Sequence, residues 1–314
     1  MKVAIFHNQQ VPPRDYGGTE RVCAWLCQGL IEAGHEVVLL APDSRAWSEV
    51  SKSIRFESWR TGEDSLQELR TRLARVPGVE ILHSMVPLPE DFEASLGVPV
   101  VTTIHGNGKP GGNGKPAEKF GPWSVFVSQD HARRHGHQRF VWNGLDPAEF
   151  EMGQEERRSG MVFLAKTSWS VKNLAGASRL CARAGVPLAI AGGERPWSVR
   201  LQALFRPGWQ WHGRVAGAQK ARILASARGF LFPVKWPEPF GLVVAEALFS
   251  GTPVLATPMG SLPELVSPEV GCLLPLRGPE DEAAWVELIR GVAEGERKFS
   301  AEACRRHALQ YFHY

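Results

Sequence analysis

Residues 229–257, GFLFPVKWPEPFGLVVAEALFSGTPVLAT, contain a strand, a helix and a second strand in one short stretch. The run GFLFPV is typical of a buried strand, and the proline after Glu238 holds that glutamate out of helical geometry. A helix is expected from Phe240 or Gly241 to about Ser250, where Gly251 ends it and the strand TPVLAT follows. The stretch therefore predicts one β-α-β unit of a parallel sheet.

The same alternation continues on both sides of this unit. Before the polar stretch 147–160, strands are expected at VAIF, EVVLLA, VEILHS, PVVTTIH and SVFVSQ. After this stretch, strands are expected at MVFLAK, VPLAIAGG, WQWHGRV, GFLFPV, TPVLAT and CLLPL. One helix is expected to start at Thr19 as its N-cap and to end at Gly34, and another near Lys172–Ala184. A chain of 314 residues suits two domains.

We therefore expect an α/β fold of two Rossmann-like, doubly wound domains that face each other across a cleft. The predicted domains are residues 1–150 and residues 151–314. Ligands of such sheets bind at the carboxyl ends of the strands. The functional residues should therefore lie in loops that lead from strands into helices.

Composition excludes several classes of protein. Hydrophobic residues make up 43% of the chain and charged residues 22%, which is typical of a globular protein. The net charge of +3 is spread without a basic stripe, which argues against nucleic-acid binding but suits an anionic small ligand or a membrane surface. No apolar run is long enough to span a membrane, and a soluble, cytoplasmic protein is expected. The five cysteines are expected to be reduced and buried.

Two further motifs imitate known sites. Residues 106–111, GNGKPG, match a dinucleotide-binding pattern, with Asp130 about twenty positions on, but the residues after them cannot start the required helix. A lid, an acceptor-binding loop or a flexible surface loop is favoured instead. His131, His135 and His137 have the spacing of metal ligands, but two arginines and no carboxylate lie among them, so a solvated short helix is favoured.

The two glutamates of the opening stretch are the main candidate site. The helix between them is apolar nearly all round and should be buried, so its first amides, on Gly241, Leu242 and Val243, need a partner such as a phosphate. Glu238 and Glu246 would then accept hydrogen bonds from hydroxyls on either side of a diphosphate, as in a nucleotide sugar. The alternative is that Glu238 is a solvated loop residue and Glu246 a paired, buried charge.

The run E-P-F-G-L-x-x-x-E at 238–246, followed by S-G-T-P-V and G-S-L-P-E-L-V, resembles the motif of the retaining GT-B glycosyltransferases of family 4. Agreement extends to YGGTERV, TIHG, WNGLD, FLAKTSWSVKN and HGRV. The resemblance implies a hexosyltransferase-type enzyme (EC 2.4) that moves a sugar from a UDP- or GDP-sugar to a sugar, glycolipid or small-molecule hydroxyl with retention of configuration. It implies no metal and no cofactor other than the donor; peripheral membrane contact is compatible with it, and the oligomeric state is open.

The resemblance also implies that residues 1–150 bind the acceptor and residues 151–314 bind the nucleotide-sugar donor. It further implies roles for individual residues. Glu238 would bind hydroxyls of the transferred sugar and Glu246 those of the ribose. The diphosphate would be held by cations and by backbone amides of the helix start: Lys166, Lys172, Phe240, Gly241, Leu242 and Val243. Gly17 and Gly18 would line the pocket, His105 would lie near the transferred sugar, and Gly213 and Val215 would flank the base. Glu238, His105 and Lys172 are the expected catalytic residues.

Two features depart from the family pattern. Lys166 stands where the family usually has Arg, and would act as a point charge without a bidentate grip. The family commonly continues beyond its last helix with a segment that packs back on the first domain, whereas this chain stops at Tyr314, so either the chain is truncated or closure between the domains is looser. The C-terminal helix is the candidate for packing back toward the first domain. A nucleotide-sugar epimerase, a non-catalytic nucleotide-sugar-binding protein and, more distantly, an NAD oxidoreductase are the alternative functions. The 11 tryptophans suit sugar stacking, although most tryptophans simply pack.

Overall fold

The structure is a computed structural model that describes residues 1–13, 17–43, 53–107, 120–154, 157–193 and 208–314. The chain forms two compact units, Met1–Gly144 together with Tyr314, and Leu145–His313. This division falls six residues before the boundary expected at residue 150. The C-terminal helix belongs to the second unit, and Tyr314 alone groups with the first unit, where its hydroxyl donates to Glu32 Oε1 at 3.0 Å.

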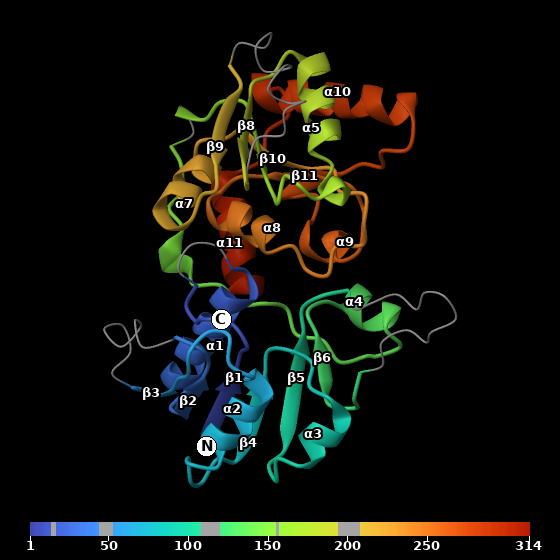
Figure 1. The fold of residues 1–314 in the computed structure, drawn as a ribbon. Coiled ribbons are helices and arrows are strands. Elements are labelled where there is room, and N and C mark those ends of the chain that lie inside the picture. The colour runs from blue at the N-terminus through green and yellow to red at the C-terminus, as the bar shows by residue number, and fades with distance from the viewer. Residues whose placement is uncertain (14–16, 44–52, 108–119, 155–156, 194–207) are drawn as a thin grey trace. The chain divides into compact units, whose positions relative to one another are not determined.

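The first unit is built on a parallel six-stranded sheet in the order β3-β2-β1-β4-β5-β6 (Figure 1). Its strands are β1 (Lys2–Phe6), β2 (Glu36–Leu40), β3 (Ile54–Glu57), β4 (Ile81–Ser84), β5 (Val100–Ile104) and β6 (Ser124–Phe126). Its helices are α1 (Thr19–Glu32), α2 (Ser65–Leu73), α3 (Glu90–Ala94) and α4 (Gln129–Arg134). Every expected strand of this half is present, and β3 is an additional strand at the edge of the sheet.

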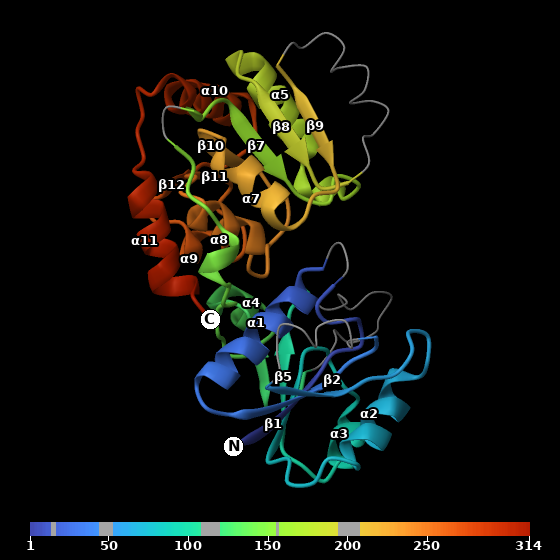
Figure 2. The same ribbon diagram turned by 90° about the vertical axis from the view of Figure 1, so that its left-hand side faces the viewer.

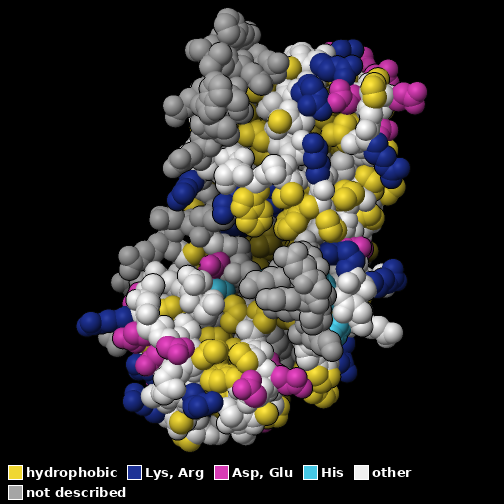
Figure 3. Space-filling model, turned by 45° about the vertical axis from the view of Figure 1, so that its right-hand side comes forward, with side chains coloured by type: hydrophobic (Ala, Val, Ile, Leu, Met, Phe, Trp, Pro, Cys, Tyr) yellow, Lys and Arg dark blue, Asp and Glu magenta, His cyan; other side chains and the backbone are white. Residues whose placement is uncertain are grey.

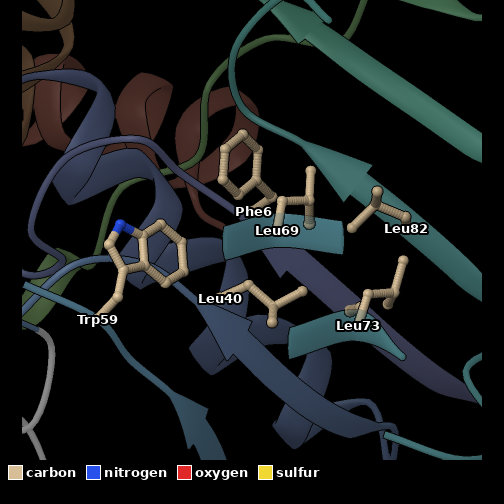
Figure 4. Close-up of a cluster of buried hydrophobic side chains, with 7 residues drawn as sticks. Phe6, Leu40, Trp59, Leu69, Leu73 and Leu82 are labelled. Carbon is tan, nitrogen blue, oxygen red and sulfur yellow. The ribbon is translucent and has the colours of Figure 1, made fainter. Parts of the chain in front are cut away.

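A buried cluster under α2 shows how strand alternation makes this core. Ala4 and Phe6 point to the same face of β1, and their sheet partners Leu82 and Leu40 point there too. The cluster consists of Ala4, Phe6, Leu40, Trp59, Leu69, Leu73 and Leu82, each at most 7% exposed (Figure 4). Since Leu69 and Leu73 are four positions apart on α2, they lie on one face of that helix and close the cluster.

The start of α1 differs from the expectation. Gly18, not Thr19, is the N-cap, and among the described residues no side chain caps the helix. Thr19 is the first helical residue, and its hydroxyl instead lies 3.2 Å from Nε2 of His7, at the end of β1. The other end is as expected, because the chain leaves the helix through Gly34, whose φ of 82° favours glycine.

The second unit repeats the architecture with the order β12-β11-β10-β7-β8-β9. Its strands are β7 (Met161–Leu164), β8 (Leu188–Ala191), β9 (Gln210–Gly213), β10 (Gly229–Phe232), β11 (Val254–Ala256) and β12 (Gly271–Leu273). Its helices are η2 (Pro147–Glu149), η4 (Ser170–Lys172), α5 (Leu174–Ala184), α7 (Gly217–Ala225), α8 (Leu242–Phe249), α9 (Leu262–Leu265), α10 (Pro279–Glu294) and α11 (Ala301–Phe312). Helices α5 and α10 pack together on one face of the sheet, and α7, α8 and α11 on the other (Figures 1 and 2).

Both sheets have the strand order of a doubly wound fold. In each, the chain runs from the first strand outward in one direction, returns, and continues from the fourth strand in the other direction. The order therefore reverses between β1 and β4 in the first unit and between β7 and β10 in the second. Ligands of such sheets bind at this reversal point, outside the carboxyl ends of the two strands. The expected pair of doubly wound α/β domains is confirmed.

The surface and the cysteines follow from composition. On the face shown in Figure 3, basic side chains are interspersed with acidic and hydrophobic ones and form no continuous stripe. None of the helices among the described residues combines the length and apolar character needed to cross a bilayer. All five cysteines are free thiols, and four of them, Cys23, Cys27, Cys181 and Cys304, are buried; Cys272 is half-buried.

Candidate functional site

The reversal point of the second sheet brings two loops together. One loop, residues 165–173, follows β7, and the other, residues 233–241, follows β10. The amide of Lys235 donates to the carbonyl of Val171 at 2.8 Å, and Asn173 Nδ2 donates to the carbonyl of Pro233 at 2.8 Å. These bonds hold the two loops side by side although they are far apart in the sequence.

Glu238 and Lys172 form an ion pair between these loops. Lys172 Nζ lies 2.6 Å from Glu238 Oε2, and their side chains are 11% and 9% exposed. The indole Nε1 of Trp236 donates to the same oxygen at 2.6 Å. Because both donors share Oε2, they limit the orientation of the carboxylate and leave Oε1 available to accept further hydrogen bonds. Glu238 is therefore not a solvated loop residue, and Trp236 is a contact that sequence reasoning missed.

The start of α8 is shaped by glycine. Gly241 is the N-cap with φ 90° and ψ 63°, a left-handed conformation that side chains rarely adopt, and Leu242 is the first helical residue. The helix ends at Phe249, so the expected bounds are confirmed within one residue at that end. Phe240 is buried, and no side chain caps the helix among the described residues. The first amides of the helix, on Leu242 and Val243, thus follow Gly241, which has no Cβ to cover them.

The turn after β11 packs against the loop 233–241 and hydrogen-bonds to it. Ser261 donates from its hydroxyl to the carbonyl of Phe240 at 2.7 Å and from its amide to the carbonyl of Glu238 at 3.0 Å. Gly260 pairs with Glu238 in a parallel bridge, and a Cβ at Gly260 would lie 2.3 Å from the Glu238 amide nitrogen. These two residues fix the position of the Glu238 backbone. They belong to the quoted run G-S-L-P-E-L-V, but their role was not predicted.

Asn173 gives the β7 loop a fixed exit into α5. It adopts φ 61° and ψ 44°, and its side chain accepts a hydrogen bond from the amide of Gly176 at 3.1 Å as the helix N-cap. A Cβ at Gly176 would lie 2.4 Å from Asn173 Nδ2, so a larger residue there would displace the capping side chain. Lys172 therefore lies two residues before the helix, which begins at Leu174, and pairs with Glu238 from there.

Glu246, on α8, is buried and forms an ion pair with a lysine. Lys220 of α7 places Nζ 2.6 Å from Glu246 Oε1, and the two side chains are 9% and 2% exposed. The alternative in which Glu246 is a paired, buried charge therefore describes its geometry in the structure. Lys220 had no signal in the sequence, because the pairing depends on how α7 packs against α8.

Lys166 lies on the same edge as Lys172 but has a different partner. Its ammonium lies over the ring of Trp169, 4.8 Å from the centroid, and makes no ion pair within the described part of the chain. Gly213 and Val215 lie farther along this edge, at and just after the end of β9. Gly213 has φ 69° and accepts a hydrogen bond from Gly192 at 2.8 Å, and Val215 is buried.

In the first unit, histidines gather at the carboxyl ends of the strands. His105 follows β5, and its neighbours are His7 after β1, His83 on β4 and His131 on α4. Burial, together with smaller contributions from the three neighbouring imidazoles, lowers the pKa of His105 to about 3. Burial also lowers the pKa of His83 and of His131 to about 4 each. His105 is therefore neutral near pH 7, and its enclosed Nε2 makes no hydrogen bond within the described residues.

Gly17 and Gly18 lie at the start of α1, near the reversal point of this sheet. A Cβ at Gly17 would come within 2.8 Å of Pro13 Cβ and closer still to the Glu20 carboxylate. The loop therefore requires glycine there for packing within the unit. Gly18 is the N-cap of α1.

The other motifs have structural roles. His131, His135 and His137 surround Phe126, with ring centroids 5.0, 5.3 and 5.0 Å from it. The short helix α4 is present as expected, but His131 is buried, so the expectation of a solvated helix is wrong at that residue. Asp130 pairs with Arg134 at 2.6 Å. Most of the GNGKPGGNGKP stretch lies outside the described residues.

A cavity of about 370 Å³ lies elsewhere in the first unit, between α2 and α3. Leu73, Val79 and Leu96 are among the residues that line it. It opens beside the segment that precedes β4, away from the carboxyl ends of the strands where the polar residues gather. This cavity is not the candidate site.

Two family models match the chain, one in each unit. The model described as Glycosyltransferase Family 4 matches residues 16–149, and the model described as Glycosyl transferases group 1 matches residues 161–294. With the two doubly wound sheets, these matches define a glycosyltransferase of the GT-B fold. The chain belongs to the family 4 type of these enzymes.

Related proteins and solved structures are similar to this protein over nearly its whole chain. An uncharacterized glycosyltransferase of Methanocaldococcus jannaschii, MJ1607, is 22% identical, over 91% of this chain and 87% of its own. Among solved structures, AviGT4, a glycosyltransferase involved in avilamycin A biosynthesis, is 24% identical with a TM-score of 0.75, covering 99% of this chain and 93% of its own. Sucrose-phosphate synthase of Thermosynechococcus elongatus is 18% identical with a TM-score of 0.74, covering 99% and 95%. The structural similarity establishes the shared fold.

Proposed function

We propose that this glycosyltransferase transfers a sugar from a nucleoside-diphosphate sugar to an acceptor hydroxyl, with retention of anomeric configuration and without a metal ion. The Lys172–Glu238 ion pair at the reversal point of the second sheet is the observation that carries the proposal. It places a cation and a hydroxyl-binding carboxylate beside the start of a buried helix. Those are the chemical groups that a diphosphate and a sugar require.

The diphosphate would lie at the start of α8. The helix dipole and the first amides, next to Gly241, favour an anion there, and the left-handed glycine lets it approach the backbone. Lys166 has no competing ion pair among the described residues, so its ammonium is available to a phosphate. Two lysines and a helix N-terminus can balance the charge of a diphosphate, which is why no metal is invoked.

The two glutamates would hold the groups on either side of the diphosphate. With Oε2 of Glu238 occupied by Lys172 and Trp236, Oε1 would accept hydrogen bonds from the transferred sugar. Glu246 lies about one turn inside the helix, four residues after Leu242, and would bind the ribose, with Lys220 as its buried counter-charge. A similar fold, that of Anabaena Alr3699/HepE, has been solved in complex with UDP and glucose (16% identical, TM-score 0.69, covering 100% of this chain and 96% of that one).

A direct transfer on one face of the sugar suits these groups. The bond from the anomeric carbon to the diphosphate oxygen breaks, the acceptor oxygen bonds to the same face, and the acceptor proton passes to the departing phosphate. Lysines and amides stabilise the charge that develops on that phosphate. Glu238 is a poor covalent nucleophile here, because two short hydrogen bonds already draw on its charge. His105, neutral at pH 7, would exchange a hydrogen bond with a sugar hydroxyl.

The test uses donor sugars alone, with water as the acceptor. The protein is incubated with UDP-glucose, UDP-galactose, UDP-N-acetylglucosamine and GDP-mannose, with and without EDTA, and the released sugar is observed by NMR before its anomers equilibrate. The expected product is the α-anomer from these α-linked donors, at the same rate with EDTA. Release of the β-anomer or loss of activity in EDTA would contradict the proposal. An epimerised donor would indicate an epimerase, and binding without turnover a binding protein.

A further inference from the structure

Two tryptophans lie in the loops that form the candidate site. Trp236 donates a hydrogen bond to Glu238, and Trp169 contacts Trp236. Trp169 is in the loop after β7, and Trp236 is in the loop after β10. Their ring centroids are 5.9 Å apart at an interplanar angle of 81°, so the rings meet edge to face. Since β7 and β10 are neighbours in the sheet, the pair spans the reversal point.

Each ring is fixed by a lysine. Lys172 Nζ lies 4.7 Å from the Trp236 centroid, and Lys166 Nζ lies 4.8 Å from the Trp169 centroid. A cation over an indole ring is attracted by the ring's electron density, which limits the orientations of both groups. The hydrogen bond from Trp236 to Glu238 adds a further restraint. These contacts favour the observed orientations of both rings without a ligand.

Trp169 is held in place but not buried. It is 44% exposed, whereas Trp25, Trp59 and Trp285 are at most 5% exposed. An indole ring left in water forgoes the stabilisation that burial of its apolar area would give, of the order of 25 cal/mol per Å². Because Trp169 lies in one of the two loops that carry Glu238, Lys166 and Lys172, its exposed ring can contact a ligand bound there.

We propose that Trp169 and Trp236 form an aromatic subsite that binds a pyranose ring. This rests on the proposed function, because it adds a contact to the same sugar-binding site. A pyranose presents C–H groups on one face and hydroxyls around its edge. The C–H face packs on the exposed indole, and an edge hydroxyl donates to Glu238, whose Oε2 is bonded to Trp236 itself. The adjacent carboxylate favours a sugar over a nucleobase as the stacked ring.

The sugar has two sources, the donor and the acceptor. Methyl α-D-glucopyranoside and methyl α-D-mannopyranoside serve as free-sugar probes, detected by saturation-transfer NMR. UDP-glucose with UDP, and GDP-mannose with GDP, serve as donor probes in isothermal titration. In each donor pair the difference between the two affinities reports the contact made by the sugar.

The variant is Trp169→Ala, with Trp169→Phe as the conservative replacement. Trp123→Ala is the matched control, because Trp123 is 62% exposed and has Arg139 over its ring at 4.9 Å, but lies in the first unit. Both alanine variants remove an exposed ring, so their melting temperatures should stay close to that of the wild type. Trp169→Phe should retain most of the binding, because it keeps an aromatic face.

Trp169→Ala should weaken sugar binding at least about fivefold, and Trp123→Ala should not change it. A loss confined to UDP-glucose or GDP-mannose identifies the donor sugar as the ligand, and a loss confined to the methyl glycosides identifies the acceptor sugar. Equal losses for UDP and UDP-glucose would indicate base stacking and overturn the subsite, as would unchanged binding of every sugar. If the wild type binds no nucleotide, the proposed function fails, and the methyl glycosides still decide on the subsite.

Discussion

Lys172 and Glu238 are 66 positions apart in the sequence, and their charged atoms lie 2.6 Å apart. The pair forms because β7 and β10 are adjacent at the point where the strand order reverses, so the loops that follow them share one edge of the sheet. Trp236 and the Gly260–Ser261 turn then hold Glu238 in place.

Lys166 should contribute to nucleotide binding more than to folding. Its ammonium makes no ion pair among the described residues, so Lys166→Ala removes a phosphate contact without leaving a buried charge. A charge-assisted hydrogen bond contributes about 1.5–3 kcal/mol, so the dissociation constant for UDP or GDP should rise about tenfold or more. Isothermal titration measures this change. Lys166→Arg should restore binding, and an unchanged affinity in Lys166→Ala would remove this lysine from the phosphate site.

The buried pair of Lys220 and Glu246 should behave as a unit. With side chains 9% and 2% exposed, removal of one partner leaves a buried charge, so Lys220→Met should destabilise the protein by about 3–5 kcal/mol. The double variant Lys220→Met with Glu246→Leu should recover much of this loss. Urea unfolding measures both. Additive losses in the double variant would show that the two charges are not coupled.

Gly260 should be required for the position of Glu238. It has φ 63°, and a Cβ there would lie 2.3 Å from the Glu238 amide nitrogen, so Gly260→Ala should cost at least about 2 kcal/mol of unfolding free energy. It should also lower donor turnover. Gly278→Ala is the matched control, because Gly278 has extended backbone and nothing within 4 Å of its added Cβ. Equal effects of the two substitutions would contradict this account of the turn.

Acid should destabilise the first unit through its histidines. Burial lowers the folded-state pKa of His83 to about 4 and of His105 to about 3, below the usual 6.5 of the unfolded chain. The unfolded chain therefore binds more protons below pH 6.5, and stability is complete above that pH and falls as the pH drops toward 4 and then 3. Urea midpoints between pH 7 and 4 measure the slope. His83→Asn should flatten it, whereas the exposed His313→Gln should not.

Much of the fold could be predicted because its signals are local. The strands of both sheets are short apolar runs, and α8 is delimited by Pro239, Gly241 and Gly251, so each could be read within a few residues. The edge strand β3, with one buried residue in IRFE, has no such pattern. The N-cap of α1 was misplaced by one residue, because the Thr19 hydroxyl contacts His7 on another element.

The candidate site was predictable only in part for the same reason. Glu238, Glu246 and Lys172 could be singled out from spacing and resemblance. Their partners could not: Trp236, Lys220 and Gly260 act through contacts that exist only after the strands have assembled. His131 was expected in solvent, but its ring packs against Phe126 and is buried. Side-chain pairing between elements is a property of tertiary structure, which one sequence does not encode in a local pattern.

The most direct test of the account concerns Glu238. In Glu238→Gln the side-chain amide has a single acceptor oxygen, and Lys172 and Trp236 would both donate to it. The NH₂ group would then face the sugar, and it cannot accept hydrogen bonds from the sugar hydroxyls. Glu269→Gln is the control, since Glu269 is an exposed carboxylate 3.3 Å from Arg306 in the same unit. Isothermal titration of UDP and GDP gives nucleotide binding, and release of nucleotide from UDP-glucose or GDP-mannose gives turnover.

Glu238→Gln should lower donor turnover at least about a hundredfold, because the carboxylate binds the sugar at the reacting centre. The affinity for nucleoside diphosphates should change by less than about threefold, because the helix start and Lys166 hold the diphosphate. Glu269→Gln should change neither quantity. Near-normal turnover in Glu238→Gln, with nucleotide binding intact, would contradict the central claim that Glu238 holds the transferred sugar.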